Sequence, residues 1–141
     1  MVLFEKPGYL TVVHEETKGY VMFKWEKFGI SLEDIKVAHK AGLETAKDKN
    51  CLYYIAETSA ATGALQESVI GWFTKEWVPT LHKEGLVAIV TVVPESSAVA
   101  RFSTKSWQAG DFSGIIMENV HSIKEAEDLL SKIKAKKHKL F

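Results

Sequence analysis

Residues 86–93 read LVAIVTVV, a run without a charged residue that is followed at once by Pro94. Most of these side chains are β-branched, and β-branched residues favour the extended backbone of a strand. An unbroken apolar run is typical of a strand covered on both faces, as the central strands of parallel sheets are. The run therefore predicts a central strand with parallel neighbours, and with it an α/β fold.

A helix is predicted immediately upstream, over residues 65–82. Pro79 is expected to kink or loosen its last turn, and Gly85 is expected to end it as a C-cap. The inner face of this helix carries apolar residues at helical spacing, which are Leu65, Val69, Ile70, Phe73, Trp77 and Leu81.

The first part of the chain predicts a hairpin followed by a helix. Residues 9–14 and 20–25 are rich in strand formers and flank a polar turn that ends in glycine, which predicts an antiparallel hairpin. Ser31, with Asp34 three residues later, matches a helix-capping pattern, and Asn50 is expected to end that helix.

The remaining elements complete an alternating order. Residues 51–56 and 115–117 are predicted strands, residues 96–107 a predicted helix, and Ser122 opens a capping box before a last helix. The resulting order is β-β-α-β-α-β-α-β-α. It predicts one α/β domain over residues 1–141, with a mostly parallel sheet and an N-terminal antiparallel hairpin.

The composition is that of an ordinary globular protein. Of the 141 residues, 46% are hydrophobic and 26% are charged, and 18 basic residues balance 18 acidic ones. A net charge of zero argues against a surface built to bind nucleic acid, so no specific nucleic-acid partner is expected. A basic tail nonetheless ends the chain, formed by Lys132, Lys134, Lys136, Lys137 and Lys139.

No catalytic, cofactor-binding or metal-binding pattern is recognisable. The five histidines lack metal-ligand spacing, and the chain has no P-loop, G-x-S-x-G or G-x-G-x-x-G motif. The single cysteine, Cys51, lies in an apolar run and is interpreted as an inert core thiol. No signal sequence is visible, and no apolar stretch approaches the roughly 20 residues that span a bilayer. We therefore expect a cytoplasmic, non-enzymatic protein without cofactors or metals.

A resemblance to a known family rests on residues 67–94, ESVIGWFTKEWVPTLHKEGLVAIVTVVP. This segment resembles the SpoIIAA-like family of small bacterial proteins in three features. They are a helix with W-x-P-x-L near its end, a glycine after the helix, and an apolar strand that ends in proline. The closing HSIKEAEDLL at residues 121–130 is similar to the last helix of that family. The resemblance implies a STAS-like fold, sometimes grouped with the CRAL-TRIO lipid-binding fold, and a regulatory or binding role.

One departure from the STAS pattern concerns phosphorylation. STAS regulators carry a D-S-[ST]-G-like turn whose hydroxyl is phosphorylated, whereas residues 57–68 here read ETSAATGALQES. The nearby hydroxyls do not match that motif, so a phosphorylation switch is not supported; they are Thr58, Ser59, Thr62 and Ser68.

A first candidate ligand site lies beyond the predicted strand over residues 51–56. Glu57, Thr58 and Ser59 follow its carboxyl end, where open parallel sheets bind ligands, and a helix begins near Leu65. Hydroxyls and free helix N–H groups are suited to an anionic headgroup or phosphate. The alternative is that the hydroxyls only cap the helix and turn the chain.

Aromatic residues suggest a second candidate surface. Trp77 falls inside the helical stripe and is interpreted as core, whereas Trp72 lies at its edge. Together with Val78, Trp72 would form an apolar surface for a partner, a lipid or a second copy of the chain. Edge packing is the alternative. A homodimer is among the expected assemblies.

The segment over residues 96–112 brings Arg101, Phe102 and Trp107 close together. Such a mixture is suited to a membrane interface or to a lid over a pocket, and an ordinary surface helix is the alternative. The leading hypothesis is thus a binding or regulatory module for a protein partner or a small apolar or anionic ligand. The second is a peripheral lipid-binding protein that uses residues 96–112 and the basic tail on anionic membranes.

Overall fold

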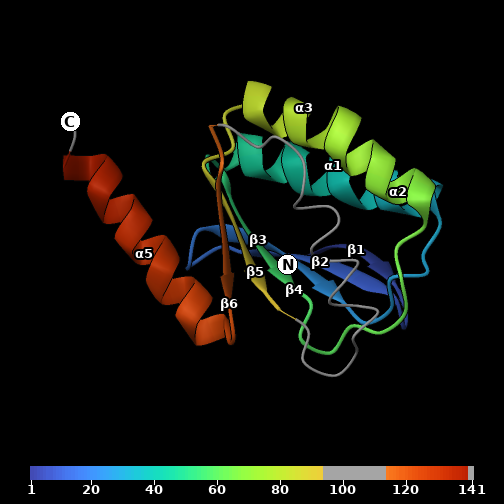
Figure 1. The fold of residues 1–141 in the computed structure, drawn as a ribbon. Coiled ribbons are helices and arrows are strands. Elements are labelled where there is room, and N and C mark those ends of the chain that lie inside the picture. The colour runs from blue at the N-terminus through green and yellow to red at the C-terminus, as the bar shows by residue number, and fades with distance from the viewer. Residues whose placement is uncertain (94–113, 140–141) are drawn as a thin grey trace.

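The computed structural model describes residues 1–93 and 114–139, which form a mixed six-stranded sheet with helices on both faces (Figure 1). The strands lie side by side in the order β1-β2-β3-β4-β5-β6. The elements in chain order are β1 (Val2–Lys6), β2 (Leu10–Glu15), β3 (Tyr20–Trp25), α1 (Leu32–Asp48), β4 (Tyr53–Glu57), α2 (Glu67–Trp72), the π-helical turn η1 (Phe73–Trp77), α3 (Val78–Lys83), β5 (Ala88–Val92), β6 (Ile116–Val120) and α5 (Ile123–Lys139).

The N-terminal strands form an antiparallel meander. β2 pairs with β3 along its whole length, from Leu10 with Trp25 to Glu15 with Tyr20, so the predicted hairpin is confirmed. The strand β1, which the sequence did not predict, adds to its edge in antiparallel pairing with β2. Its five residues include Glu5 and Lys6 and show no clean alternation of buried and exposed positions, so the pattern that predicts a strand is missing.

The other strands are parallel to one another, and β5 lies between β4 and β6. All five residues of β5 are buried, so the prediction of a central strand with parallel neighbours and two covered faces is confirmed. The strands β4 and β6 run over residues 53–57 and 116–120, shifted by a few residues from the predicted 51–56 and 115–117.

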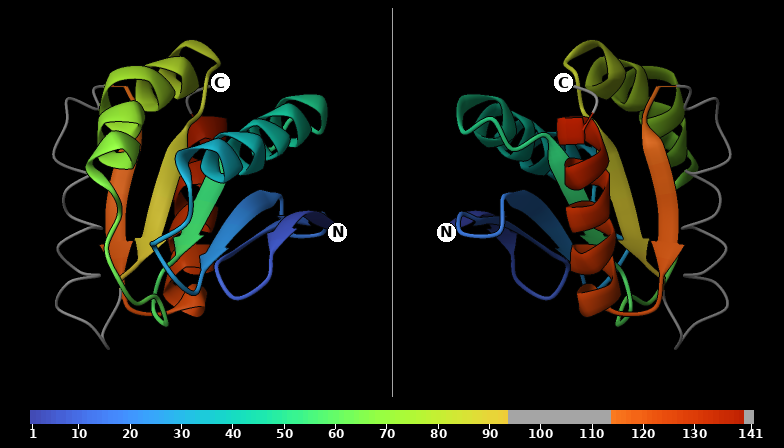
Figure 2. Two further views of the ribbon diagram at one scale, coloured as in Figure 1. Left: turned by 90° about the vertical axis from the view of Figure 1, so that its right-hand side faces the viewer. Right: turned by 90° about the vertical axis from the view of Figure 1, so that its left-hand side faces the viewer.

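The helices divide between the two faces of the sheet. α1 and the helix formed by α2, η1 and α3 cover one face, and α5 crosses the other, where it leaves β1 and β2 uncovered (Figure 2). The larger hydrophobic core lies under α1 and the α2–η1–α3 helix, and a smaller core lies under α5 around Ile55, Val90 and Leu130. The predicted helix over residues 96–107 lies outside the described residues.

The ends of the helices follow the predicted local signals. The Ser31 hydroxyl accepts a hydrogen bond from the Asp34 N–H (3.2 Å), and Asn50 ends α1 with a positive φ of 51°. The Ser122 hydroxyl likewise accepts from the Glu125 N–H at 3.1 Å, while the Glu125 carboxylate accepts from the His121 N–H. These caps satisfy N–H groups that a helix start leaves unpaired.

The helix over residues 67–83 contains an irregular turn that periodicity did not predict. In the π turn η1 the Val78 N–H donates to the carbonyl of Phe73, five residues back. Pro79 follows directly. It has no N–H to donate to the carbonyl four residues before it, and in a regular helix its ring would clash with that carbonyl. The loosened turn that was predicted from Pro79 therefore lies just before the proline. Gly85, with a φ of 88°, ends the helix as expected.

Candidate functional site

A cavity of about 40 Å³ lies between the sheet and the α1 and α2–η1–α3 helices. Aromatic rings from β3, the following loop, α1, β4 and η1 make up seven of the twelve described lining residues, and none of the twelve is a lysine or an arginine. The lining residues are Phe23, Trp25, Phe28, His39, Tyr54, Ala56, Leu65, Phe73, Trp77, Val78, Leu81 and Ile89. We call this space the aromatic cavity.

His39 enters the aromatic cavity from α1 and is only 5% exposed. Its Nδ1–H donates to the Ile35 carbonyl at 2.8 Å, one helical turn back, which leaves a lone pair on Nε2. Burial lowers the pKa of His39 to about 4, so the ring is neutral at pH 7. Rings of Phe73 and Trp77 meet it edge-on, with centroids 5.0 and 5.5 Å from the imidazole centroid.

Tyr54 enters the cavity wall from β4 and is 3% exposed. Its hydroxyl has no hydrogen-bond partner in the part of the chain that the structure describes. Burial raises the pKa of Tyr54, so this hydroxyl stays protonated and can both donate and accept. A buried hydroxyl without a partner is costly, and such groups in folded proteins usually meet a water or a ligand.

The π turn supplies the side chains that close the cavity over His39. Phe73 and Trp77, its first and last residues, are both buried, which confirms the interpretation of Trp77 as core. π turns inside α-helices occur frequently at functional sites. Here the wider turn positions two of the rings that surround the imidazole.

Trp72 packs beside this wall and meets the His39 ring edge-on, with centroids 5.8 Å apart. It is half-buried, and its ring stacks on Trp77 with centroids 5.1 Å apart and planes inclined by 17°. Val78 is only 2% exposed, so the apolar surface expected from Trp72 and Val78 together does not form. Val78 instead lies in the wall of the aromatic cavity.

Glu57, Thr58 and Ser59 lie together at the carboxyl end of β4, as their sequence positions predicted. The Glu57 carboxylate accepts hydrogen bonds from the N–H and the hydroxyl of Ser59, at 2.8 and 2.6 Å. The Thr58 hydroxyl donates to the Val92 carbonyl, which ties the loop to β5. These polar groups are thus engaged within the sheet edge itself, and their binding of an anion stays a prediction.

The remaining predicted residues belong to the segment over residues 96–112 and to the basic tail. Arg101, Phe102 and Trp107 lie outside the described residues. Of the basic tail, Lys134 is engaged: its Nζ donates to the Lys18 and Gly19 carbonyls and lies 4.7 Å from the Tyr53 ring centroid.

The side chains that the structure describes, those of residues 1–93 and 114–136, include no group of three or more His, Cys, Asp or Glu placed to bind a metal ion. No helix within these ranges is long and apolar enough to cross a membrane. Comparisons with models of protein families, with curated proteins and with solved structures find no match to this chain. Geometry is therefore the basis on which a function can be proposed.

Sequence reasoning missed His39 and Tyr54. His39 lies four residues after Ile35 and four before Leu43, both on the buried face of α1, so helical spacing places it inward. That signal was present in the sequence. The unpaired hydroxyl of Tyr54 has no such signal, because it depends on which groups other elements bring near it.

Proposed function

We propose that this protein is a binding module that takes a small, uncharged, largely apolar molecule into the aromatic cavity. The observation that carries the proposal is the buried hydroxyl of Tyr54, which has no partner among the described residues and belongs to a wall made mostly of aromatic rings. A ligand with one polar group would satisfy it. Binding sites of this kind are mostly apolar with a few polar groups that fix orientation.

The charge of the proposed ligand follows from the cavity wall. The described lining carries no cationic side chain, and His39 is neutral at pH 7 because burial lowers its pKa to about 4. An anion would lose its hydration without gaining a compensating charge, which is costly. The aromatic cavity therefore favours an uncharged ligand over an anionic one.

The size of the proposed ligand follows from the volume. About 40 Å³ is well below the roughly 150 Å³ of a cavity that holds benzene. The space suits a molecule of a few non-hydrogen atoms, or the end of a longer one. With His39 Nε2 as an acceptor and Tyr54 as donor and acceptor, the best polar group is a hydroxyl.

The family resemblance is compatible with this proposal. The α/β order, the parallel β3–β6 strands and the N-terminal antiparallel strands support a STAS-like or SpoIIAA-like assignment, which we propose together with a regulatory role in the cytoplasm. Under this proposal the ligand, rather than phosphorylation, controls the module.

Titration of ¹⁵N-labelled protein with three small probes tests the proposal. Isopropanol is uncharged and has a hydroxyl, acetate has the same number of heavy atoms but is charged, and dimethyl sulfide is apolar. We expect saturable shifts of the Trp25 and Trp77 indole N–H signals with isopropanol, and none with acetate. One hydrogen bond of about 1 kcal/mol corresponds to about a fivefold preference for isopropanol over dimethyl sulfide.

Two tyrosine variants make the titration specific. Tyr54→Phe removes the unpaired hydroxyl and should abolish the preference for isopropanol. Tyr20→Phe, which alters a hydroxyl under α5 that already donates to Glu127, should preserve it. Shifts that do not saturate, or the same preference in Tyr54→Phe, would rule the proposed function out.

A further inference from the structure

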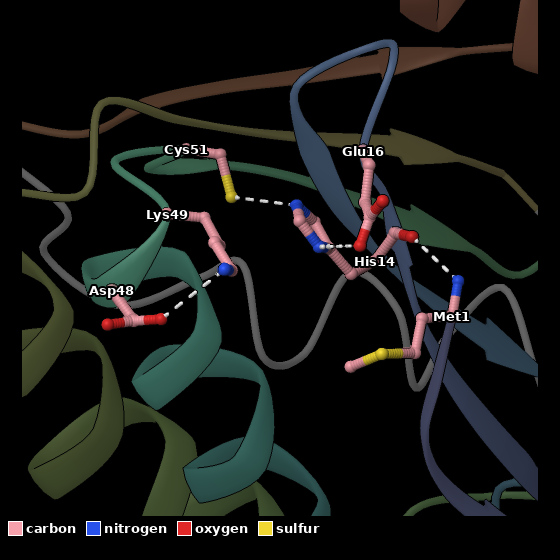
Figure 3. Close-up of polar contacts among 6 residues, drawn as sticks. All are labelled: Met1, His14, Glu16, Asp48, Lys49 and Cys51. Atoms are coloured by element: carbon pink, nitrogen blue, oxygen red, sulfur yellow. Dashed lines mark hydrogen bonds and ion pairs between the residues drawn. The ribbon is translucent and has the colours of Figure 1, made fainter.

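A second polar cluster, separate from the aromatic cavity, joins the buried side chains of Cys51 and His14 to Glu16 (Figure 3). Cys51 lies in the turn between α1 and β4, and its Sγ is 3.5 Å from Nε2 of His14 on β2. The two side chains are 5% and 4% exposed. On the other side of the imidazole, Nδ1 lies 3.9 Å from Oε1 of Glu16, which is mostly exposed.

The charges in this cluster fix the proton positions. Burial is the largest influence on Cys51 and raises its pKa, so the resting group is a thiol that can donate to His14 Nε2. The imidazole proton then lies on Nδ1 and faces the Glu16 carboxylate. The opposite tautomer would turn a lone pair of Nδ1 toward that carboxylate, which is unfavourable.

His14 Nδ1 is also a buried polar atom without a hydrogen-bond partner in the described part of the chain. Its distance from Glu16 is too long for a hydrogen bond but short enough for an ion pair once the ring carries a second proton. The cluster thus has an acceptor for the thiol proton, and a carboxylate that stabilises the imidazolium formed. Thiol, imidazole and carboxylate in this order are the parts of an activated nucleophile.

We propose that Cys51 is a reversibly oxidisable thiol for which His14 is the base and Glu16 a positioning residue, and that its oxidant is a small neutral hydroperoxide. The inference does not rest on the proposed ligand cavity. A neutral molecule close to water in size is the oxidant best suited to a thiol that is 5% exposed, because charged oxidants would have to lose their hydration.

The reaction balances without any further reactant. The thiol proton moves to His14 Nε2 while sulfur gives an electron pair to one oxygen of hydrogen peroxide, so that an S–O bond forms and the O–O bond breaks. The departing hydroxide takes the proton from Nε2 and leaves as water. Cys51 becomes a sulfenic acid, oxidised by two electrons, and the peroxide is reduced by two.

Sulfenic-acid trapping on the chain of residues 1–141 tests the proposal. Native protein is treated with hydrogen peroxide, the peroxide is removed with catalase, and the chain is then unfolded in the presence of dimedone, so that the reagent reaches the buried sulfur. The adduct on Cys51 is followed by mass spectrometry. Cys51→Ala gives the background. We expect adduct formation in the native wild type to fall at least about tenfold in His14→Gln, in which the base is lost.

Exposed residues near the cluster provide variants that leave the core intact. Glu16→Gln should slow trapping about threefold, whereas Lys49→Gln, at the neighbouring end of α1 in Figure 3, should leave the rate unchanged. The ¹⁵N shifts of the His14 ring give a second readout. They should place the proton on Nδ1 in the wild type and show loss of that preference in Glu16→Gln.

The proposal is overturned if the adduct forms only when the chain is unfolded before the peroxide is added, or if Glu16→Gln reacts at the wild-type rate with an unchanged His14 tautomer. If His14→Gln does not fold, as judged by circular dichroism, the Glu16→Gln rate and the tautomer decide the question alone. Failure here would leave the isopropanol titration unaffected, because Cys51, His14 and Glu16 do not line the aromatic cavity.

Discussion

The imidazole of His39 is stacked on the ring of Phe23, with centroids 4.6 Å apart and planes inclined by 19°. The stack joins α1 to β3 in the wall of the aromatic cavity, and it places a titratable ring among apolar neighbours. Protonation of His39 would bury a charge that water cannot reach. The stability of the fold is therefore linked to pH through this residue.

We predict that stability falls as pH is lowered from about 6.5 to about 4. In the folded chain burial lowers the pKa of His39 to about 4, below its ordinary value of 6.5, so the unfolded chain binds more protons in this window. The stabilisation is fully present above pH 6.5, and its loss on acidification amounts to about 3 kcal/mol.

Urea denaturation of the wild type and of His39→Leu over this pH range measures the effect. The variant keeps all carboxylates, so the difference between the two unfolding free energies isolates the histidine. A difference that stays constant from pH 7 to pH 4 would show that His39 is not held neutral by its surroundings.

Two glycines in helices should respond with opposite signs to alanine. A Cβ on Gly42 would lie 2.7 Å from Cζ of Phe23, a ring held between His39 and Tyr54, so we expect Gly42→Ala to cost about 1–2 kcal/mol despite its better helix propensity. A Cβ on Gly71 meets no atom within 4 Å, and Gly71→Ala should gain about 0.5–1 kcal/mol. Thermal unfolding of both variants compares them, and a shift of the same sign would contradict the packing around Phe23.

Two buried tyrosines should likewise differ. The Tyr20 hydroxyl donates to Oε2 of Glu127 at 2.7 Å, so Tyr20→Phe should lose about 1–2 kcal/mol. The Tyr54 hydroxyl has no partner among the described residues, so Tyr54→Phe should be neutral or gain up to about 1 kcal/mol. Chemical denaturation decides between them, and equal losses would mean that Tyr54 has a partner in the free protein.

Alanine substitutions of two aromatic residues on the α2–η1–α3 helix test which of its side chains face the core. Phe73 is 6% exposed and lines the aromatic cavity, so Phe73→Ala should cost about 3–5 kcal/mol. Trp72 is half-buried and packs beside the wall, so Trp72→Ala should cost clearly less. Similar losses in a denaturant titration would refute this assignment.

The parts of the fold that the sequence predicted are those decided by local chemistry or by a strong pattern. The apolar run at residues 86–93 is stable in few conformations other than a strand covered on both faces. Ser31 and Ser122 cap helices through hydrogen bonds that span only three residues. Asn50 and Gly85 end helices because their backbones adopt positive φ.

The parts that could not be predicted depend on partners distant in the sequence. In the π turn a backbone hydrogen bond runs to the carbonyl five residues back, and such a turn produces no distinct period of apolar residues in the sequence. Pro79 was the only sequence signal of an irregularity in this helix. The pairing of Cys51 with His14 joins residues 37 positions apart. The aromatic cavity likewise requires β3, β4, α1 and η1 to be in place together.

A crystal structure of the protein soaked in isopropanol tests the central claim most directly, with Tyr54→Phe crystals treated in the same way as the control. We predict a bound probe in the aromatic cavity with its oxygen about 2.6–3.2 Å from the Tyr54 hydroxyl, and no such density in the variant. A wild-type crystal in which the cavity stays empty and the Tyr54 hydroxyl bonds to a protein group would contradict the account.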